Sequence, residues 1–206
     1  MKMTLLDLAG SMLALIFGAI VTYCGGINYL ILLLVFLFSS VVVTKYGYEE
    51  KREIGLYEHE RSWENVFANG FIPTICAVLT PFIGWAPYAC SIAAITADKF
   101  ASELGVLGSD PVSILTLKKT KKGKSGAVSL LGTLTSFDGA LLVGIAVALI
   151  YPNISLWTVL FIALIGFIGS FVDTIFGILE ERGIGNKSTT NIICSIAGAL
   201  LGFLLM

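Results

Sequence analysis

Four acidic side chains lie inside or at the edge of apolar stretches of this 206-residue chain: Asp98, Glu103, Asp138 and Asp173. A carboxylate inside a membrane helix is costly unless it is paired or hydrated, so such residues mark candidate functional sites. The alternative is a helix end whose side chain reaches the headgroup region, and this stays open above all for Glu103. Asp138 lies near the middle of its apolar stretch, where it is either functional or a structural hydrogen-bonding group.

Asp98 and Asp173 occupy corresponding positions in two similar stretches, "AITADKFASELGVLG" (94–108) and "GSFVDTIFGILEERG" (169–183). In each, small residues precede the aspartate, a serine or glycine follows one turn later, and further acids come soon after. One apolar stretch separates the two, so the helices are expected to run in the same direction, as in a parallel repeat. On the same interpretation Asn69 and Asn191, each early in an apolar stretch, extend the repeat; chance similarity is the alternative.

Small residues share a helix face with each of these aspartates, at spacings of three and four residues. They are Ala94, Ala101, Ser102 and Gly105 around Asp98, and Gly166, Gly169, Ser170 and Gly177 around Asp173. Small side chains allow two helices to approach closely, so Asp98 and Asp173 are predicted to lie near each other. Two bare carboxylates repel, and either Mg²⁺ or Lys99 would neutralise them. Glu103 lies about 140° around the helix from Asp98, so both reach one ion only if the helix end unwinds.

A basic segment, "LKKTKKGKSGAVS" (117–129), leads directly into an apolar stretch. Its G-K-S tripeptide resembles part of a P-loop, but that pattern requires glycine at position 118, which is lysine, and no strand precedes it. Glycine and serine at a helix start expose backbone N–H groups that suit phosphate. The alternative is a loop that sets membrane orientation or attracts anionic lipid headgroups. The predicted phosphate-binding residues of this segment are Lys122, Lys124, Ser125, Gly126 and Ser129.

The composition is typical of a polytopic membrane protein, since 56% of the residues are hydrophobic and only 13% are charged. A membrane helix needs about 20 apolar residues, and seven stretches qualify: 4–23, 27–44, 65–83, 86–104, 128–150, 155–177 and 189–206. The predicted fold is an all-α helical bundle forming a single integral membrane domain over 1–206. Its two peripheral helices fall in 1–44 and its core in 61–206. Pro73 and Pro81 predict that the third helix is kinked or broken.

The basic residues predict the orientation of the bundle. All 13 lysines and arginines lie at the N-terminus, in the polar segments 45–64, 105–127 and 178–188, or at Lys99. The positive-inside rule places these segments, and the candidate site, on the cytoplasmic side of a prokaryotic plasma membrane. The N-terminus is then cytoplasmic and the C-terminus lies outside. No nucleic-acid partner is indicated, and the four cysteines lack metal-ligand spacing, so they are interpreted as small hydrophobic residues.

Five motifs resemble, in order, a family of polytopic membrane proteins long known only as a domain of unknown function. They are "RSWENVFANG", "ADKFASELG", "GKSGAVSLLGT", "FVDTIFG" and "NKSTTN", spread over residues 61–202. The family includes the plant phytyl-phosphate kinases of prenyl-alcohol salvage. "ADKFASELG" is similar to the family's Asp-Thr-x-Ala-Ser-Glu-x-Gly block, but Lys99 stands where the family usually has threonine or serine. A hydroxyl ligand at that position is therefore not expected.

The resemblance implies transfer of a phosphoryl group from a nucleoside triphosphate, CTP or ATP, to a prenyl monophosphate, with membrane lipid as the surroundings. Phosphoryl transfer requires mainly positioning and charge neutralisation. On this hypothesis Asp98, Glu103 and Asp173 are catalytic and hold Mg²⁺. The residues assigned to substrate or phosphate binding are the five of the basic segment, with Asn69, Asn191, Asp138 and Lys187.

Other function classes stay open from the sequence. Intramembrane acids and a repeat also suit an ion-coupled transporter or flippase, although the acids lie near one membrane face rather than at mid-depth. A CTP-dependent lipid-phosphate cytidylyltransferase would use the same substrates and release pyrophosphate. A purely structural membrane protein leaves the buried acids unexplained. Neither the prenyl chain length nor the oligomeric state is predicted.

Overall fold

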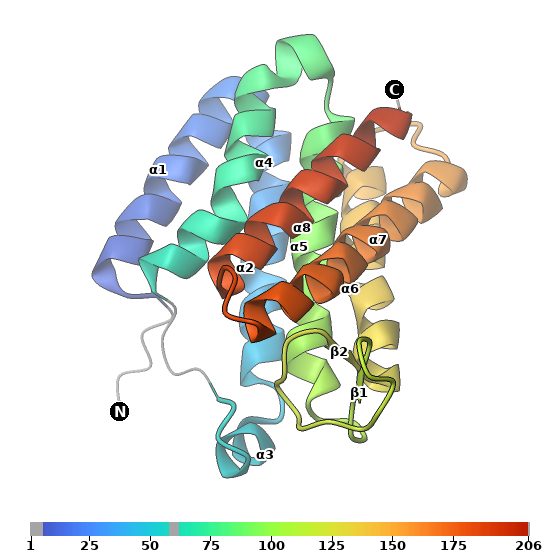
Figure 1. The fold of residues 1–206 in the computed structure, drawn as a ribbon. Coiled ribbons are helices and arrows are strands. Elements are labelled where there is room, and N and C mark those ends of the chain that lie inside the picture. Colours follow the sequence, from blue (N-terminus) through green and yellow to red (C-terminus); the bar gives the residue numbers. More distant parts are fainter. Residues whose placement is uncertain (1–5, 58–61, 206) are drawn as a thin grey trace.

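The computed structural model describes residues 6–57 and 62–205, and this part of the chain is a bundle of long helices (Figure 1). A short antiparallel pair of strands interrupts the loop between the fifth and sixth helices. The elements are α1 (Leu8–Gly25), α2 (Ile27–Lys45), α3 (Tyr48–Glu53), α4 (Trp63–Ile83), α5 (Ala86–Gly105), β1 (Val112–Ser113), β2 (Ala127–Val128), α6 (Leu130–Ile150), α7 (Leu156–Glu181), α8 (Lys187–Gly202) and the 3₁₀ turn η1 (Phe203–Leu205). The all-α fold is as predicted, and the seven long helices match the seven predicted stretches to within a few residues.

Polar side chains set where several helices begin. Asp7 accepts a hydrogen bond from the backbone N–H of Gly10, and Asn186 accepts one from that of Thr189. Such side chains satisfy N–H groups that have no partner within the helix. The uncharged turns after α1 and α4 contain Gly26 (φ 78°) and Gly84 (φ 65°), in a backbone region that favours glycine.

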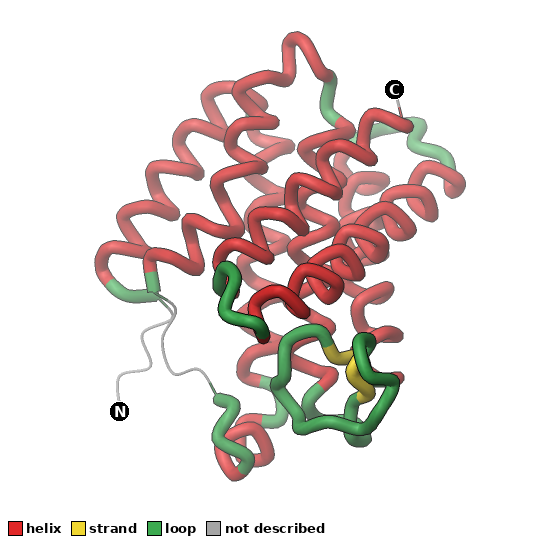
Figure 2. Tube along the Cα trace, viewed as in Figure 1, coloured by secondary structure: helices red, strands yellow, loops and turns green. Residues whose placement is uncertain are grey.

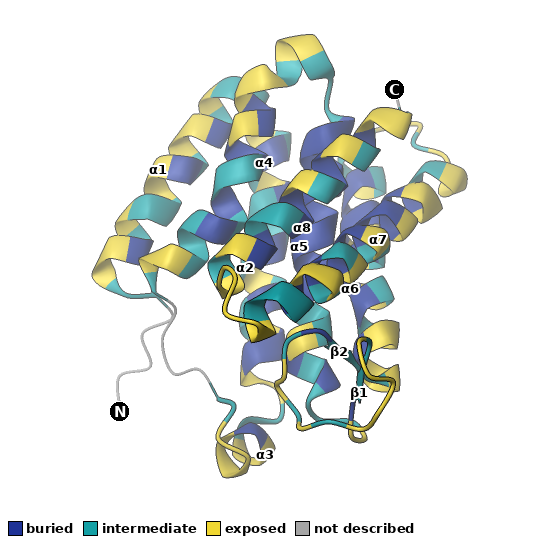
Figure 3. Ribbon diagram, viewed as in Figure 1, coloured by how far each residue is buried: buried dark blue, intermediate teal, exposed yellow. Residues whose placement is uncertain are grey.

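Helix α5 differs from the other long helices because it runs through the middle of the bundle. Six helices are long and apolar enough to cross a membrane, and α5 is not among them in the described residues. Every residue from Ala86 to Asp98 is buried, and α5 packs against α2, α4, α6, α7 and α8 (Figure 3). A helix surrounded by protein does not need a lipid-compatible surface, so alanine and serine replace the leucines of the outer helices.

Small residues allow this close packing. A Cβ atom added to Gly169 would lie 2.6 Å from the Cβ of Ala94, and one added to Gly198 would lie 2.5 Å from the carbonyl oxygen of Cys90. These contacts bring α7 and α8 directly onto α5. For α5 and α7, the small residues on their faces predicted this close approach. Cys76, Cys90 and Cys194 are free and buried, which confirms their interpretation as small core residues.

The third predicted stretch is helix α4, which is continuous, so of the two predicted forms, kinked or broken, the broken one is wrong. Pro73 and Pro81 both lie inside one continuous helix from Trp63 to Ile83. Proline removes one backbone hydrogen bond but leaves the other bonds of the helix intact. Packing against α1, α5 and α8 holds the helix together across both prolines.

The polar segments gather at one end of the bundle. Helix α3, the β1–β2 loop and the connection from α7 to α8 all lie there, and the uncharged turns after α4 and α6 lie at the other end (Figures 1 and 2). Helices α5 and α7 therefore run in the same direction, and α6 runs between them in the opposite one. This arrangement is the one that a parallel repeat requires, and it places the C-terminal ends of α5 and α7 beside the starts of α4, α6 and α8.

Candidate functional site

A cavity of about 530 Å³ opens at the polar end of the bundle. Its walls come from the starts of α4, α6 and α8, the ends of α5 and α7, and the loop that contains β2. All but one of the predicted site residues line it: Asn69, Asp98, Glu103, Lys122, Lys124, Ser125, Gly126, Ser129, Asp173, Lys187 and Asn191. Residues from 69 to 191 thus meet in one place, which a chance distribution of polar residues would not produce.

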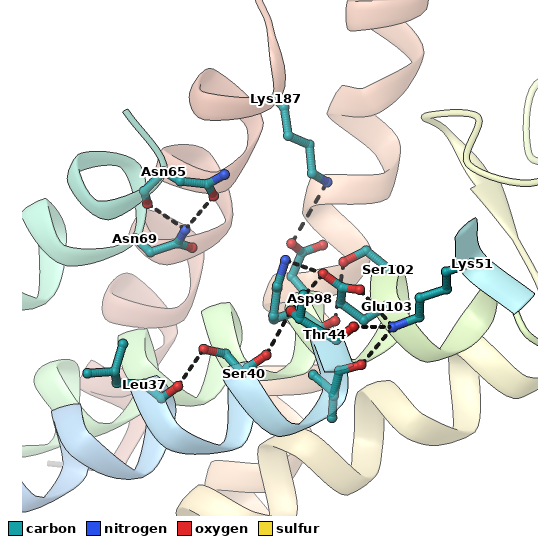
Figure 4. Close-up of polar contacts among 12 residues, drawn as sticks. Leu37, Ser40, Thr44, Lys51, Asn65, Asn69, Asp98, Ser102, Glu103 and Lys187 are labelled. Carbon is teal, nitrogen blue, oxygen red and sulfur yellow. Dashed lines mark hydrogen bonds and ion pairs between the residues drawn. The ribbon is translucent and has the colours of Figure 1, made fainter. Parts of the chain in front are cut away.

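The two aspartates that the sequence paired lie together at the centre of this cavity. Lys187 reaches both, with its Nζ atom 3.9 Å from Asp98 Oδ2 and 3.5 Å from Asp173 Oδ2. Both aspartates are buried, whereas the lysine side chain is half exposed. Figure 4 shows Lys187 reaching toward Asp98. Lys187 therefore contacts both carboxylates and offsets the repulsion between them.

Several oxygen atoms of the cavity wall are buried without a hydrogen-bond partner. Buried polar atoms in folded proteins are nearly always hydrogen-bonded, so such atoms need an explanation. Within the described part of the chain they are Ser136 Oγ, Asp173 Oδ1, Glu180 Oε2, Asn191 Oδ1 and Ser195 Oγ, and all but Ser195 belong to the cavity wall. Carboxylate and amide oxygens are the donors that hard divalent cations take. The atoms around Asp173 and Asn191 therefore suit a cation or a hydrogen-bonding ligand.

Glu103 lies in the same wall, but its carboxylate is already satisfied. It pairs with Lys51 Nζ at 2.9 Å and with Lys99, and it accepts a hydrogen bond of 2.9 Å from the Thr44 hydroxyl (Figure 4). Lys51 is completely buried and also donates to the carbonyl oxygens of Val43 and Thr44. The cluster ties α2, α3 and α5 together at their polar ends.

The predicted three-carboxylate metal site is accordingly not formed. Among the residues that the structure describes, no group of three histidine, cysteine, aspartate or glutamate side chains is arranged to hold a metal ion. Helix α5 stays regular through Gly105, so Glu103 keeps its place around the helix from Asp98. The structure brings together Asp98 and Asp173 and directs Glu103 to two lysines instead.

The basic segment forms the cavity wall nearest the end of α7. The backbone N–H of Ser125 donates to Glu181 Oε1 (3.1 Å), and Lys124 Nζ lies 3.4 Å from Glu181 Oε2. The segment passes close to α7, since a Cβ on Gly177 would lie 2.7 Å from the backbone nitrogen of Gly126. The Ser125 N–H, which the sequence predicts as a phosphate-binding group, donates here to a carboxylate, which is also an anion.

Two further predicted residues have structural partners in the cavity wall. The Ser129 hydroxyl caps α6 by accepting from the Gly132 N–H, and it donates to the Gly105 carbonyl oxygen at 3.1 Å. Asn69 Nδ2 donates to the Asn65 carbonyl oxygen at 2.8 Å, one turn earlier in α4. Ser129 therefore joins α5 to α6, while the Asn69 amide oxygen is the part of that side chain left for a ligand.

Asp138 is the predicted site residue that does not belong to the cavity. It is exposed, it does not line the cavity, and it lies on the side of α6 opposite the buried Ser136. The structure thus places Asp138 outside the cavity, apart from the other predicted site residues. Hydropathy alone placed it at mid-depth but could not show which face of an apolar helix it occupies.

The sequence did not identify Lys51 or Ser136 as residues of this region. Lys51 sits in "EEKRE", which resembles any solvated charged turn, and its partner Glu103 is 52 residues away. Glu180 and Glu181 continue the Asp173 face of α7 by helical spacing. Glu180 lines the cavity, and Glu181 contacts Lys124 and Ser125 of the basic segment. Ser136 carries no such signal, because nothing in an apolar helix distinguishes one serine from another.

Comparisons with known proteins place the chain among integral membrane proteins. A family profile described as "Integral membrane protein DUF92" matches residues 1–200. An uncharacterized membrane protein of Methanocaldococcus jannaschii is 40% identical over 99% of this chain and 87% of its own length. Protein PGR of Arabidopsis thaliana is 30% identical over 84% of this chain and 70% of its own length. An uncharacterized membrane protein of Synechocystis sp. is also 30% identical, over 80% of this chain and 67% of its own length. No solved structure matches.

Proposed function

The chain belongs to the integral membrane protein family DUF92, and we propose that it is a membrane-embedded kinase that makes a prenyl diphosphate from a prenyl monophosphate. The observation that carries this proposal is the cavity in which Asp98, Asp173 and Lys187 meet beside oxygen atoms that lack partners. The resemblance of its motifs to the family of the phytyl-phosphate kinases supports the substrate class. The buried position of the acids argues against a purely structural role.

The proposed reaction requires no covalent bond between the protein and its substrates. A phosphate oxygen of the prenyl monophosphate attacks the γ-phosphorus of the nucleoside triphosphate, the bond to the β–γ bridging oxygen breaks, and the nucleoside diphosphate leaves. The attacking oxygen is already anionic at neutral pH, so no general base is required. Catalysis is then a matter of positioning and of neutralising phosphate charge, and buried acids beside lysines at a membrane surface suit this task.

The residues present fit a divalent cation such as Mg²⁺. Asp98, Asp173 and the Asn191 amide oxygen would hold it, and when bound it would neutralise charge on the nucleotide phosphates. Lys187 bridges the two carboxylates in the structure and would turn its ammonium group to a phosphate once the carboxylates have another partner. Lys122, Lys124 and the Ser125 N–H supply further cationic and N–H contacts along the same wall.

The proposed orientation in the membrane places the polar end of the bundle on the cytoplasmic side. Helix α3, the β1–β2 loop and the α7–α8 connection, which carry most of the basic residues, lie at one end of the bundle (Figure 1), and the positive-inside rule assigns that end to the cytoplasm. Nucleoside triphosphates are present on that side. A prenyl phosphate would hold its phosphate at the headgroup level and its chain in the apolar part of the membrane.

Product analysis tests the proposal. Purified protein in detergent is incubated with Mg²⁺, γ-labelled CTP or ATP, and geranylgeranyl or phytyl phosphate, and the products are separated by chromatography. The proposal predicts a labelled prenyl diphosphate together with CDP or ADP. Release of pyrophosphate would identify a cytidylyltransferase instead. No nucleotide consumption with any prenyl phosphate would contradict both enzyme assignments and favour transport.

A further inference from the structure

The cavity does not end at the charged residues, but continues between α6 and α7. Besides the charged residues, its wall includes Thr133 and Ser136 of α6 and, deeper along α7 than Asp173, Phe167 and Phe171. From Asp173 to Phe167 the wall runs six residues along α7, which is about 9 Å in a helix. This part of the wall carries hydroxyl and aromatic groups and no charged side chain.

Close helix contacts define the deep end of this extension. A Cβ on Gly166 would lie 2.8 Å from the Ala140 Cβ, and one on Gly144 would lie 2.7 Å from the Val159 carbonyl oxygen. Helices α6 and α7 therefore touch from about this level onward, and the cavity occupies the space between them nearer the polar end. The basic segment closes the space from above, where Gly126 lies against Ile178.

The sides of the extension reach the outer surface of the bundle. Thr133 is exposed and Phe171 is 45% exposed, although both line the cavity, whereas Ser136 and Asp173 are buried. Among the exposed neighbours of this rim, Leu134 on α6 and Ile175 on α7 are apolar, and Asp138 follows Leu134 one turn later. Both helices are among those apolar enough to span a membrane, so an opening here faces hydrocarbon rather than water.

We propose that this opening is a lateral portal, through which the apolar chain of a lipid monophosphate passes while its phosphate lies at Asp98, Asp173 and Lys187. The inference rests on the proposed function for its choice of substrate. It adds the route: the chain lies between α6 and α7, with Phe167 and Phe171 against it. The nucleotide, which is polar, enters from the opposite direction, past Lys122 and Lys124.

A bulky side chain introduced at the rim of the portal should affect long-chain substrates more than short-chain ones. Thr133→Trp fills the portal, and Leu134→Trp puts the same bulk on the adjacent outward position that does not line the cavity. We expect Thr133→Trp to raise KM for geranylgeranyl phosphate by about tenfold or more and to leave kcat/KM for dimethylallyl phosphate unchanged. Leu134→Trp should match the wild type with both. An equal loss with both substrates, or no loss with either, would overturn the portal.

A photochemical experiment decides the same question without turnover. A geranylgeranyl monophosphate with a diazirine in its chain is bound to the full-length protein, irradiated, and the adducts are mapped by mass spectrometry. The portal predicts adducts on residues 130–137 and 167–174 that excess unmodified lipid phosphate removes and that Thr133→Trp diminishes. Adducts spread over the outer faces of α1 and α4, or unaffected by the block, would overturn it. Should Thr133→Trp fail to fold, Thr133→Phe provides a smaller block.

The two experiments also separate failure of the portal from failure of the kinase. If no prenyl phosphate is turned over but the adducts map to α6 and α7, the protein binds a lipid phosphate through the portal for another purpose. If turnover is normal and the adducts lie elsewhere, the kinase stands and the portal does not.

Discussion

Two groups of acids lie at the polar end of this bundle, and they are built differently. Glu103 is surrounded by Lys51, Lys99 and the Thr44 hydroxyl. Asp98 and Asp173 share one half-exposed lysine, and Asp173 keeps a buried oxygen without a partner. A carboxylate with a full set of partners holds helices together, whereas a buried pair that keeps an oxygen without a hydrogen-bond partner is suited to binding a ligand.

The difference also appears in where the cations come from. Lys51 is completely buried and reaches Glu103 from α3, so this ion pair fixes a short helix onto the bundle. Lys187 stands at the start of α8 and stays half exposed, and in the proposed function it would exchange a carboxylate for a phosphate. The first pair is permanent and the second is replaceable, which is the distinction that the following variants test.

Asp173→Asn should have the largest effect on activity. The amide keeps the shape of the side chain but removes the charge that would hold a cation, so we expect turnover of a prenyl phosphate to fall by about 10²–10³-fold or more. The melting temperature in detergent should change little, because the remaining Asp98–Lys187 contact is kept. Wild-type turnover in this variant would remove Asp173 from the site.

Glu103→Gln should instead have the largest effect on stability. It leaves Lys51 buried without its charged partner, and removal of one member of a buried pair costs about 3–5 kcal/mol. We expect a clearly lowered melting temperature, with turnover per folded molecule close to wild type.

The control for this variant is the double change Glu103→Leu with Lys51→Met, which removes both charges and should recover much of the lost stability. A Glu103→Gln protein that melts like the wild type but is inactive would reverse the comparison and make Glu103 catalytic.

Lys187→Met should lower kcat/KM by an intermediate amount, about tenfold to a hundredfold, because it removes one charged hydrogen-bond donor from the phosphate site. Lys187→Arg keeps the charge and should recover most of the activity at saturating substrate. Steady-state kinetics with both substrates check this. Equal losses in the methionine and arginine variants would indicate that the lysine acts through the fold rather than through its charge.

Asp138→Leu should have the smallest effect of the series. Its side chain lies on the outward face of α6, away from the cavity, and an exposed carboxylate on a membrane helix is unfavourable. We expect unchanged turnover and an unchanged or raised melting temperature in lipid. A loss of turnover comparable with Asp173→Asn would show that the outer face of α6 takes part in the reaction.

The sequence predicted those features that depend on local pattern. Apolar length located the seven long helices, and small residues at helical spacing predicted that Asp98 and Asp173 meet. Lys122, Lys124 and Asn191, which the sequence predicts as phosphate-binding residues, also line the cavity.

Features that depend on long-range contacts or on helix orientation could not be predicted. The partner of Glu103 comes from α3, and a lysine in a charged turn carries no sign that it will be buried. The orientation of Asp138 was equally hidden, because α6 is apolar on every side and only packing selects its inner face. The portal combines both difficulties, since it requires the relative placement of α6 and α7.

Binding of Mn²⁺ in place of Mg²⁺, followed by electron paramagnetic resonance in the presence of a non-hydrolysable nucleoside triphosphate, tests the central claim most directly. The account predicts one bound ion in the wild type and in Glu103→Gln, and greatly weakened binding in Asp98→Asn and Asp173→Asn. Equal binding in all four proteins, or loss of the ion only in Glu103→Gln, would contradict it.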